Sequence, residues 1–398
     1  MKPVNGVEVS NPIQLSLNHR VFFSRDVFSP KSQLLFSQLS MPEDLNPARC
    51  LVFMDEGLVD HNPDLPRVID DYFSRNSSQV ALVGEPKIIS GGEKAKSDLK
   101  NFLRILKEIE SHRLCRHSYV IAVGGGAVLD AVGFAASLVH RGLRQVRVPT
   151  TVLAQCDAGI GIKNGINWRG QKNFLGTFQV PHLILNDFKL LETLTDEDWR
   201  DGTAEAVKVA LIRDREFFEW IEKNTKEIMS RDSDAMELLI RRCAELHLRQ
   251  ITKGGDPFEL GSSRPLDFGH WLAHKLERTS GFQLTHGHSV AVGIAVDSLY
   301  SSRLGLLSPD EFERILFCLS ELGFPLRVVN RIDPGAGLKG EGLIEALLGG
   351  VADFQEHLGG RLTLTLIKEI GVPVEVSEID GYQMRQVLRK IILGSADF

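Results

Sequence analysis

The sequence predicts an α/β domain followed by a mainly helical domain. In the first half of the 398-residue chain, short apolar runs alternate with helical segments, which is typical of a parallel sheet covered by helices. Beyond about residue 190, almost every periodic segment has helical spacing. The composition, with 43% hydrophobic and 25% charged residues, is that of an ordinary globular protein. We therefore expect two domains, at residues 1–190 and 191–398.

Strands are expected in the first domain wherever an apolar or alternating run is short. These runs are residues 14–23, 50–54, 79–83, 119–123, 144–148 and 182–185. Helical spacing at residues 99–110, and from about 128 to 140, places helices between the strands. The turn Gly124-Gly125-Gly126 falls between a strand and a helix.

The second domain is expected to consist mainly of helices. Helical spacing is present at residues 196–210, 216–230, 234–250, 268–278, 290–304 and 309–322. The last of these has a clear start, because Ser308 is a good helix cap and Pro309 suits the first turn. One late strand is expected at residues 361–367, where leucine and threonine alternate.

Composition and charge exclude several classes of protein. A net charge of −6 and a pI of about 6.1 leave no basic face for nucleic acid. The five cysteines are scattered, which favours a reducing compartment, and the start of the chain lacks the apolar run of a signal peptide. Residues 121–139 are apolar, but they contain three adjacent glycines and Asp130, which a bilayer would penalise. We expect a cytoplasmic protein with neither a nucleic-acid nor a membrane partner.

The glycine turn has the geometry of a phosphate cradle. Glycine lets the backbone approach a pyrophosphate, and the N-terminus of the following helix supplies N–H groups and partial positive charge. Three glycines between a strand and a helix can equally form only a tight turn. Both interpretations stay open at this point.

Two groups of charged residues follow the turn. Lys163 and Lys172 flank a Gly-rich polar stretch, and Asn173 follows Lys172. Glu205 and Lys208 are one helical turn apart and therefore share a face of their helix. Spacing alone is typical of an exposed ion pair that contributes little to stability.

Histidines are concentrated in one part of the second domain. His270 and His274 are spaced to share a helical face, and His286 and His288 follow within a short distance. A glutamate and two histidines make a sound ligand set for Zn²⁺ with an open coordination position, as in a catalytic site. The alternative is that these histidines cap helices or pack in the core.

The motifs together resemble the dehydroquinate synthase family of sugar-phosphate cyclases. The family pattern contains a GGG turn, PTTLLAQVDSSVGGKT, a KN pair, GxAExxK, NxGHxxxH and a later HGE. In this chain the matching segments, in the same order, are Gly124–Gly126, Pro149–Lys163, Lys172-Asn173, Gly202–Lys208, Asp267–His274 and His286-Gly287. The resemblance implies a Rossmann-like N-terminal domain and a helical metal-binding C-terminal domain.

The resemblance also implies a role for each matching residue. The metal ligands, normally for zinc and with cobalt as a possible substitute, would be Glu205, His270 and His286. The NAD-contacting positions would be Asp55, Glu93, Lys96, Gly124, Gly125, Gly126, Asp130, Thr150, Thr151 and Asp157. The catalytic positions would be Lys163, Lys208, Asp267 and His274. The positions that bind the sugar phosphate would be Lys172, Asn173, Arg249, Arg264 and Arg141, the last reaching the neighbouring active site of a homodimer.

The implied enzyme is a carbon–oxygen lyase that regenerates NAD within each turnover, while phosphate leaves and a carbocycle closes. The departures from the pattern concern the carboxylate of a heptulosonate substrate. Asp267 replaces the family asparagine, Arg249 replaces a lysine, Arg264 is displaced by one position, and the late DKK motif aligns with residues 353–356, which have no lysine.

These departures favour sedoheptulose 7-phosphate, which has no carboxylate, over the heptulosonate 7-phosphate of a 3-dehydroquinate synthase. Two other hypotheses remain. One is a metal-dependent polyol dehydrogenase with the same architecture, and the other is a binding protein that has lost catalysis. The lysine-rich set around Lys172 argues against a simple alcohol substrate, and the complete metal triad argues against lost catalysis.

Overall fold

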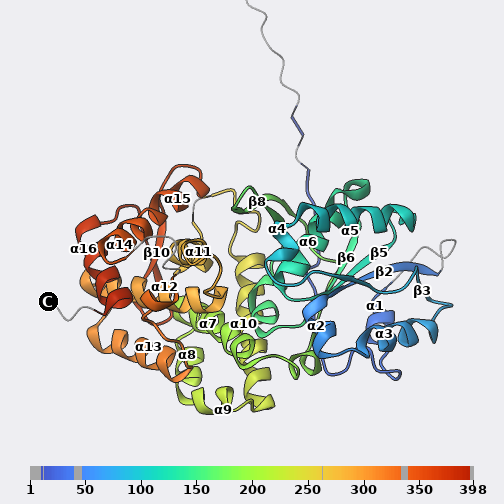
Figure 1. Ribbon diagram of the computed structural model, residues 1–398, viewed down its shortest axis with the longest axis horizontal. Coiled ribbons are helices and arrows are strands. Elements are labelled where there is room, and N and C mark those ends of the chain that lie inside the picture. Colours follow the sequence, from blue (N-terminus) through green and yellow to red (C-terminus); the bar gives the residue numbers. More distant parts are fainter. Residues whose placement is uncertain (1–9, 12, 40–46, 262, 333–338, 395–398) are drawn as a thin grey trace, which may run out of the picture.

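The computed structural model describes residues 10–11, 13–39, 47–261, 263–332 and 339–394. Figure 1 shows a half that contains the sheet, built by the N-terminal residues, beside a helical half built by the C-terminal residues. The long helices α7 (Asp196–Arg213) and α10 (Ser233–Lys253) lie between them. The predicted fold class, a parallel α/β domain with a mainly helical C-terminal domain, is confirmed.

A seven-stranded sheet forms the centre of the N-terminal half. Its order is β1-β9-β6-β5-β2-β3, β4 also pairs with β2, and all these pairs are parallel. The strands are β1 (Val21–Ser24), β2 (Ala48–Asp55), β3 (Val80–Leu82), β4 (Lys87–Ile89), β5 (Tyr119–Gly124), β6 (Arg144–Pro149) and β9 (Leu183–Asp187).

Helices cover both faces of this sheet, which explains the uninterrupted apolar runs at residues 50–54 of β2 and 119–123 of β5. Val52 and Met54 pack into the same core as α1 (Leu34–Gln38) and α3 (Leu65–Ser74). Leu51 and Phe53 point to the opposite face, into the core shared with α5 (Leu99–Ser111) and α6 (Gly126–Leu138). Short helices α2 (Glu56–His61) and α4 (Lys94–Ser97) follow β2 and β4.

An antiparallel hairpin of β7 (Lys163–Trp168) and β8 (Gln171–Phe178) lies outside the sheet and packs on α6 and α4. The Gly-rich polar stretch of the sequence forms this hairpin. Arg147, on β6, supports its base. The buried guanidinium of Arg147 donates hydrogen bonds to the carbonyl oxygens of Gly161 at 2.6 Å and Lys163 at 3.0 Å.

The helical half encloses one large apolar core. Helices α7 and α12 pack on each other inside it, and α11 packs on α12. The elements beyond α7 are α8 (Arg215–Lys223), α9 (Thr225–Met229), α10, α11 (His270–Thr279), α12 (His286–Arg303), α13 (Pro309–Glu321), α14 (Glu341–Leu348), α15 (Gly350–His357), β10 (Leu364–Glu369), β11 (Val372–Val376) and α16 (Gly381–Leu388).

Two predicted elements are wrong in extent. The strand expected at residues 14–23 covers only Val21–Ser24, because the alternating residues before it are not buried against the sheet; Ile13 is 94% exposed and Leu15 is 76% exposed. The helix expected at residues 216–230 is divided into α8 and α9 at Asn224, whose φ of −115° is not helical. Across the residues that the structure describes, no helix is long and apolar enough to cross a membrane.

Candidate active site and metal centre

The crevice at the carboxyl ends of β2 and β5 is the natural ligand site of the sheet. From β2 the chain continues to β3 and β4 on one side, whereas from β5 it continues to β6 and β9 on the other. In open α/β sheets, ligands bind where the strand order reverses in this way. Asp55 ends β2 and Gly124 ends β5, and a carboxylate oxygen of Asp55 accepts a hydrogen bond from the N–H of Gly125 at 3.4 Å.

The three glycines of the turn are required for different reasons. A Cβ atom at Gly124 or Gly126 would lie 2.8 Å from another side chain, so packing alone requires these two. At Gly125 the nearest atoms would be Thr151 Cγ2 at 3.5 Å and Asp55 Oδ2 at 3.8 Å, which are ordinary contacts. Packing therefore does not require glycine at Gly125, which precedes the N-terminus of α6, and close approach of a phosphate group to the backbone would account for it.

The end of β6 lies beside this turn. The N–H of Thr150 donates to the carbonyl of Gly124 at 3.1 Å, and the hydroxyl of Thr151 accepts from the N–H of Ala154 at 3.1 Å. Thr151 thus begins the short helical turn Ala154–Ala158, which carries Asp157 towards the helical half. The structure brings these predicted cofactor residues together with the glycine turn.

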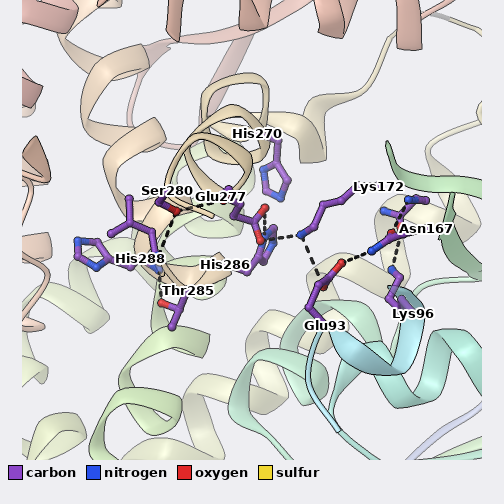
Figure 2. A network of polar contacts seen from close by, with 12 residues as sticks. Glu93, Lys96, Asn167, Lys172, His270, Glu277, Ser280, Thr285, His286 and His288 are labelled. Carbon is purple, nitrogen blue, oxygen red and sulfur yellow. Dashed lines mark hydrogen bonds and ion pairs between the residues drawn. The ribbon is translucent and has the colours of Figure 1, made fainter. Parts of the chain in front are cut away.

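The hairpin joins predicted cofactor residues to predicted substrate residues (Figure 2). The ammonium group of Lys96 donates to Asp130 at 2.6 Å and also bonds the side chain of Asn173. Glu93 lies 3.8 Å from the ammonium group of Lys172. The two sets therefore form one continuous polar region between α4, α6 and β8.

Glu205, His270 and His286 have the geometry of a metal site. Glu205 lies within α7, while His270 and His286 are the first residues of α11 and α12. Glu205 Oε1 lies 3.6 Å from His270 Nε2 and 3.4 Å from His286 Nε2. Metal–ligand bonds of about 2.0–2.2 Å in a tetrahedral site separate ligand atoms by about 3.4 Å. Glu205 is fully buried, and Oε1 has no hydrogen-bond partner among the described residues, so the set fits a divalent cation.

Both histidines present Nε2 to this position because their other nitrogen is engaged. Nδ1 of His270 lies 3.1 Å from the carbonyl oxygen of Phe268, and Nδ1 of His286 lies 3.3 Å from Glu277 Oε2. Such partners fix the ring orientation of a metal-ligating histidine. Burial alone would lower the pKa of His286, but Glu277 and Glu205 together raise it to about 10 in the metal-free protein.

Lys208 and Glu205 form a buried ion pair, and the exposed pair that spacing alone suggested is wrong. The two side chains are 1% and 0% exposed, and Lys208 Nζ lies 2.5 Å from Glu205 Oε2. Asp157 Oδ1 lies 3.6 Å from Lys208 Nζ and 3.0 Å from His247 Nδ1. Burial would raise the pKa of Asp157, but Lys208 and His247 hold it well below its usual range. These contacts join α7 and α10 to the sheet half.

Lys163 and Arg264 converge on a carboxylate of the protein itself. Lys163 forms an ion pair with Glu259, and Arg264 lies 3.5 Å from the other oxygen of Glu259. The ring of Phe258 packs against Phe178 of β8 at 5.8 Å between centroids. The segment after α10 therefore lies against the hairpin and carries one acidic residue to two predicted substrate cations.

The remaining predicted residues divide into near and distant ones. The charge of Asp267 acts on the pKa of both Lys208 and His270, and the His274 ring lies 5.5 Å from the His270 ring. Arg249 is exposed on α10, and Arg141 is exposed just beyond the C-terminal end of α6. The structure does not bring these two arginines to the cluster.

Two family models match the chain. The model described as 3-dehydroquinate synthase N-terminal matches residues 87–201, and the model described as 3-dehydroquinate synthase C-terminal matches residues 202–340. A 3-dehydroquinate synthase from Rhodopseudomonas palustris (strain BisB18) is 36% identical over 315 residues, which is 78% of this chain and 80% of that protein. The chain belongs to the 3-dehydroquinate synthase family.

Solved structures of this family's fold agree. A 2-epi-5-epi-valiolone synthase from Streptomyces hygroscopicus subsp. jinggangensis 5008, with NAD⁺ and Zn²⁺ bound, superposes with a TM-score of 0.82 at 27% identity, over 96% of this chain and 99% of that chain. A 2-deoxy-scyllo-inosose synthase complexed with carbaglucose-6-phosphate, NAD⁺ and Co²⁺ has a TM-score of 0.75 at 21% identity, over 94% of this chain and 96% of that chain, and shows the fold alone. The NAD⁺ and Zn²⁺ bound to the valiolone synthase are the cofactors predicted from the sequence. The prediction of a cyclase of the lyase class is confirmed for the family.

The predicted residues of the dehydroquinate synthase pattern omit two groups that the structure places in the cluster. Glu277 follows His270 by seven residues and His274 by three, so helical spacing placed it on their face and could have revealed it. His247 carries no such signal, because only the packing of α10 on residues Ala154–Ala158 brings it to Asp157. His288 points away from the cluster, with Nε2 2.6 Å from the carbonyl oxygen of Pro325.

Proposed function

We propose that this protein is an NAD- and zinc-dependent sugar-phosphate cyclase that acts on a seven-carbon ketose 7-phosphate, with sedoheptulose 7-phosphate as the favoured substrate. The observation that carries the proposal is the triad of the buried Glu205 and His270 and the partly buried His286, whose ligand atoms are spaced for one metal ion. The triad lies beside the cationic residues of α7 and β8, so a metal ion and a phosphate group would have adjacent sites.

The cofactor sites fit the residues present. The triad would hold the metal, and the turn at Gly125 would hold the pyrophosphate of NAD next to the N-terminus of α6. When bound, the metal supplies Lewis-acid polarisation of a substrate hydroxyl, and NAD supplies reversible hydride transfer. Asp55 and Thr151 line the approach to the turn.

The chain's own residues would hold the substrate and move protons. Lys163, Lys172 and Asn173 supply a set of donors suited to a dianionic phosphate. His274 is partly buried, and desolvation together with the neighbouring His270 keeps its pKa well below its usual range. We assign His274 to proton transfer because its ring lies beside the triad, 5.5 Å from the ring of His270, while Lys208 holds its charge beside Glu205.

The acidic groups of the site favour a substrate without a carboxylate. The charge of Asp267 acts to raise the pKa of Lys208 and of His270, so this carboxylate would repel a substrate carboxylate in the site and could accept hydrogen bonds from hydroxyl groups. Arg264, which could otherwise neutralise a substrate carboxylate, already lies 3.5 Å from the carboxylate of Glu259. In the late segment, Asp353 is bound by side chains of α11 and contributes no positive charge.

The alternative substrate is the heptulosonate 7-phosphate of a true 3-dehydroquinate synthase. Relatives that carry that name are 36% identical to this chain over more than three quarters of its length, and this observation favours the alternative. The structural likeness to a butanol dehydrogenase, at 15% identity and a TM-score of 0.65, concerns the fold alone and does not favour a dehydrogenase.

We further propose that the enzyme is a cytoplasmic homodimer. Arg141 follows α6, whose 13 residues extend about 20 Å away from the glycine turn. Arg141 is exposed there, and we assign it to a neighbouring active site rather than to its own. The proposed domains remain residues 1–190 and 191–398, although the two family models meet at residues 201 and 202, inside α7.

Incubation of the purified protein with NAD⁺ and Zn²⁺ or Co²⁺ tests the function. Sedoheptulose 7-phosphate and the heptulosonate are supplied separately, and phosphate release and the cyclic product are measured by mass spectrometry. We expect turnover of the first substrate without steady accumulation of NADH. NADH that accumulates in step with product would favour the dehydrogenase, and a preference of more than about tenfold for the heptulosonate would overturn the substrate choice and leave the cyclase in place.

A further inference from the structure

Glu277 of α11 lies between the candidate metal ligand His286 and the hairpin lysine Lys172 (Figure 2). We propose that Glu277 is a positioning residue, which holds His286 with Nε2 directed at the metal and ties that ligand to the sheet half of the protein through Lys172. This inference rests on the proposed metal site.

The contacts of Glu277 are directional and buried. Its side chain is 5% exposed, Oε1 lies 2.6 Å from the ammonium group of Lys172, and Oε2 lies 3.3 Å from His286 Nδ1. Each carboxylate oxygen therefore serves one partner. Because Nδ1 of His286 is held by Glu277, Nε2 is the nitrogen that faces Glu205 Oε1, at 3.4 Å, and that is directed at the metal position.

The two histidines of the triad differ in the group that orients them. His270 is oriented by a backbone carbonyl, that of Phe268, which no substitution can remove. His286 is oriented by a side chain, which substitution can remove. A carboxylate also makes the ring it contacts a stronger metal ligand than a carbonyl does, so loss of Glu277 should weaken metal binding through His286.

Two other roles for Glu277 lead to different expectations. If the residue only stabilises the contact between the two halves, its effect should depend on Lys172 and should leave metal affinity unchanged. If Glu277 is itself a ligand, in the group it forms with His274 and His286, the protein should bind a second metal ion. Both roles can be separated from positioning by measuring metal affinity and stoichiometry.

The experiment titrates metal-stripped protein with Zn²⁺ against a chromophoric chelator and records the visible spectrum of the Co²⁺ form. Glu277→Leu removes the acceptor, Glu277→Gln restores a neutral one, and Lys172→Met removes the other partner. We expect one metal ion per chain. Affinity should fall about 10–100-fold in Glu277→Leu and less in Glu277→Gln. We expect Lys172→Met to bind metal within about threefold of the unsubstituted protein, and the Co²⁺ spectrum to change only in the Glu277 variants.

Several outcomes would overturn the inference. Equal affinity in all three variants would leave Glu277 without a role at the metal while the proposed function stands. An equal loss in Lys172→Met and Glu277→Gln would assign the effect to the contact between the halves. Two metal ions per chain would make Glu277 a ligand. A chain that binds no metal would overturn both this inference and the proposed metal site, so the two failures are distinguishable.

Discussion

Replacing Lys208 with methionine should destabilise the metal-free protein strongly. Lys208 lies 2.5 Å from the fully buried carboxylate of Glu205 and 3.6 Å from the partly buried carboxylate of Asp157. Methionine has nearly the same length and no charge. The substitution therefore leaves the packing almost unchanged while both carboxylates lose their main counter-charge.

The magnitude follows from burial. Lys208 is 1% exposed and Glu205 is fully buried, so solvent cannot replace the lost partner. Removing one partner of a buried pair costs about 3–5 kcal/mol of the free energy of unfolding. For a domain of about 150–250 residues, each kcal/mol lowers Tm by about 2–4 °C, so the melting temperature should fall by about 6–20 °C.

The assay is thermal unfolding of chelator-treated protein, with Lys163→Met as the matched control. Lys163 undergoes the same chemical change, but its side chain is 55% exposed, so its ion pair with Glu259 should contribute about 1 kcal/mol or less. The double substitution of Lys208→Met with Glu205→Gln should recover part of the loss, because it removes one of the stranded charges. If Lys208→Met and Lys163→Met melt within about 2 °C of each other, the buried ion pair has been misread.

Three further predictions concern the cofactor turn, pH and the substrate. Gly125→Val should fold with nearly normal stability but lose NAD binding in a fluorescence titration. Gly126→Ala should instead lower Tm, because its Cβ would lie 2.8 Å from another side chain. Normal NAD affinity in Gly125→Val would contradict the role of Gly125 at the pyrophosphate. Burial raises the pKa of Asp297 from 3.8 to about 7, so the stability that its protonated form contributes is present at low pH and is lost as the pH rises from about 4 to 7. In urea titrations, the free energy of unfolding of Asp297→Asn relative to that of the unsubstituted protein should therefore increase from pH 5 to 8. A difference that stays constant with pH would refute the assignment. Asp267→Asn should lower kcat/KM for sedoheptulose 7-phosphate without producing efficient turnover of the heptulosonate, and a reversal of preference would show that Asp267 alone decides selectivity.

Strong local patterns allowed most of the fold to be predicted. Residues 50–54 of β2 and 119–123 of β5 are continuous apolar runs, and these strands end at Asp55 and Gly124, close to the predicted ends. The hairpin of β7 and β8 was not predicted, because its strands are rich in glycine and polar residues and several face solvent. Its conformation depends on tertiary contacts, including those of the buried Arg147 with the carbonyl oxygens at its base.

The candidate site was predictable where residue type and spacing carry the information. Glu205, His270 and His286 could be named because a resemblance in motif order pointed to them, and the structure brings them together. The burial of Glu205 with Lys208 could not be predicted, since a pair one helical turn apart has the same spacing on an exposed face as on a buried one. Spacing within a helix reports which residues share a face and not what that face contacts.

The charges of the site balance only when the two halves are assembled. Lys208 of the helical half pairs with Asp157 of the sheet half, and Lys172 of the sheet half pairs with Glu277 of the helical half. Each half therefore supplies a cation to a carboxylate of the other. If the halves separated, both ion pairs would be broken. These contacts therefore favour one position of the helical half relative to the sheet half, and in that position the glycine turn and the metal triad lie on the same side of the sheet half. The residues that position the metal ligands and the residues that hold the two halves together are, in this protein, largely the same.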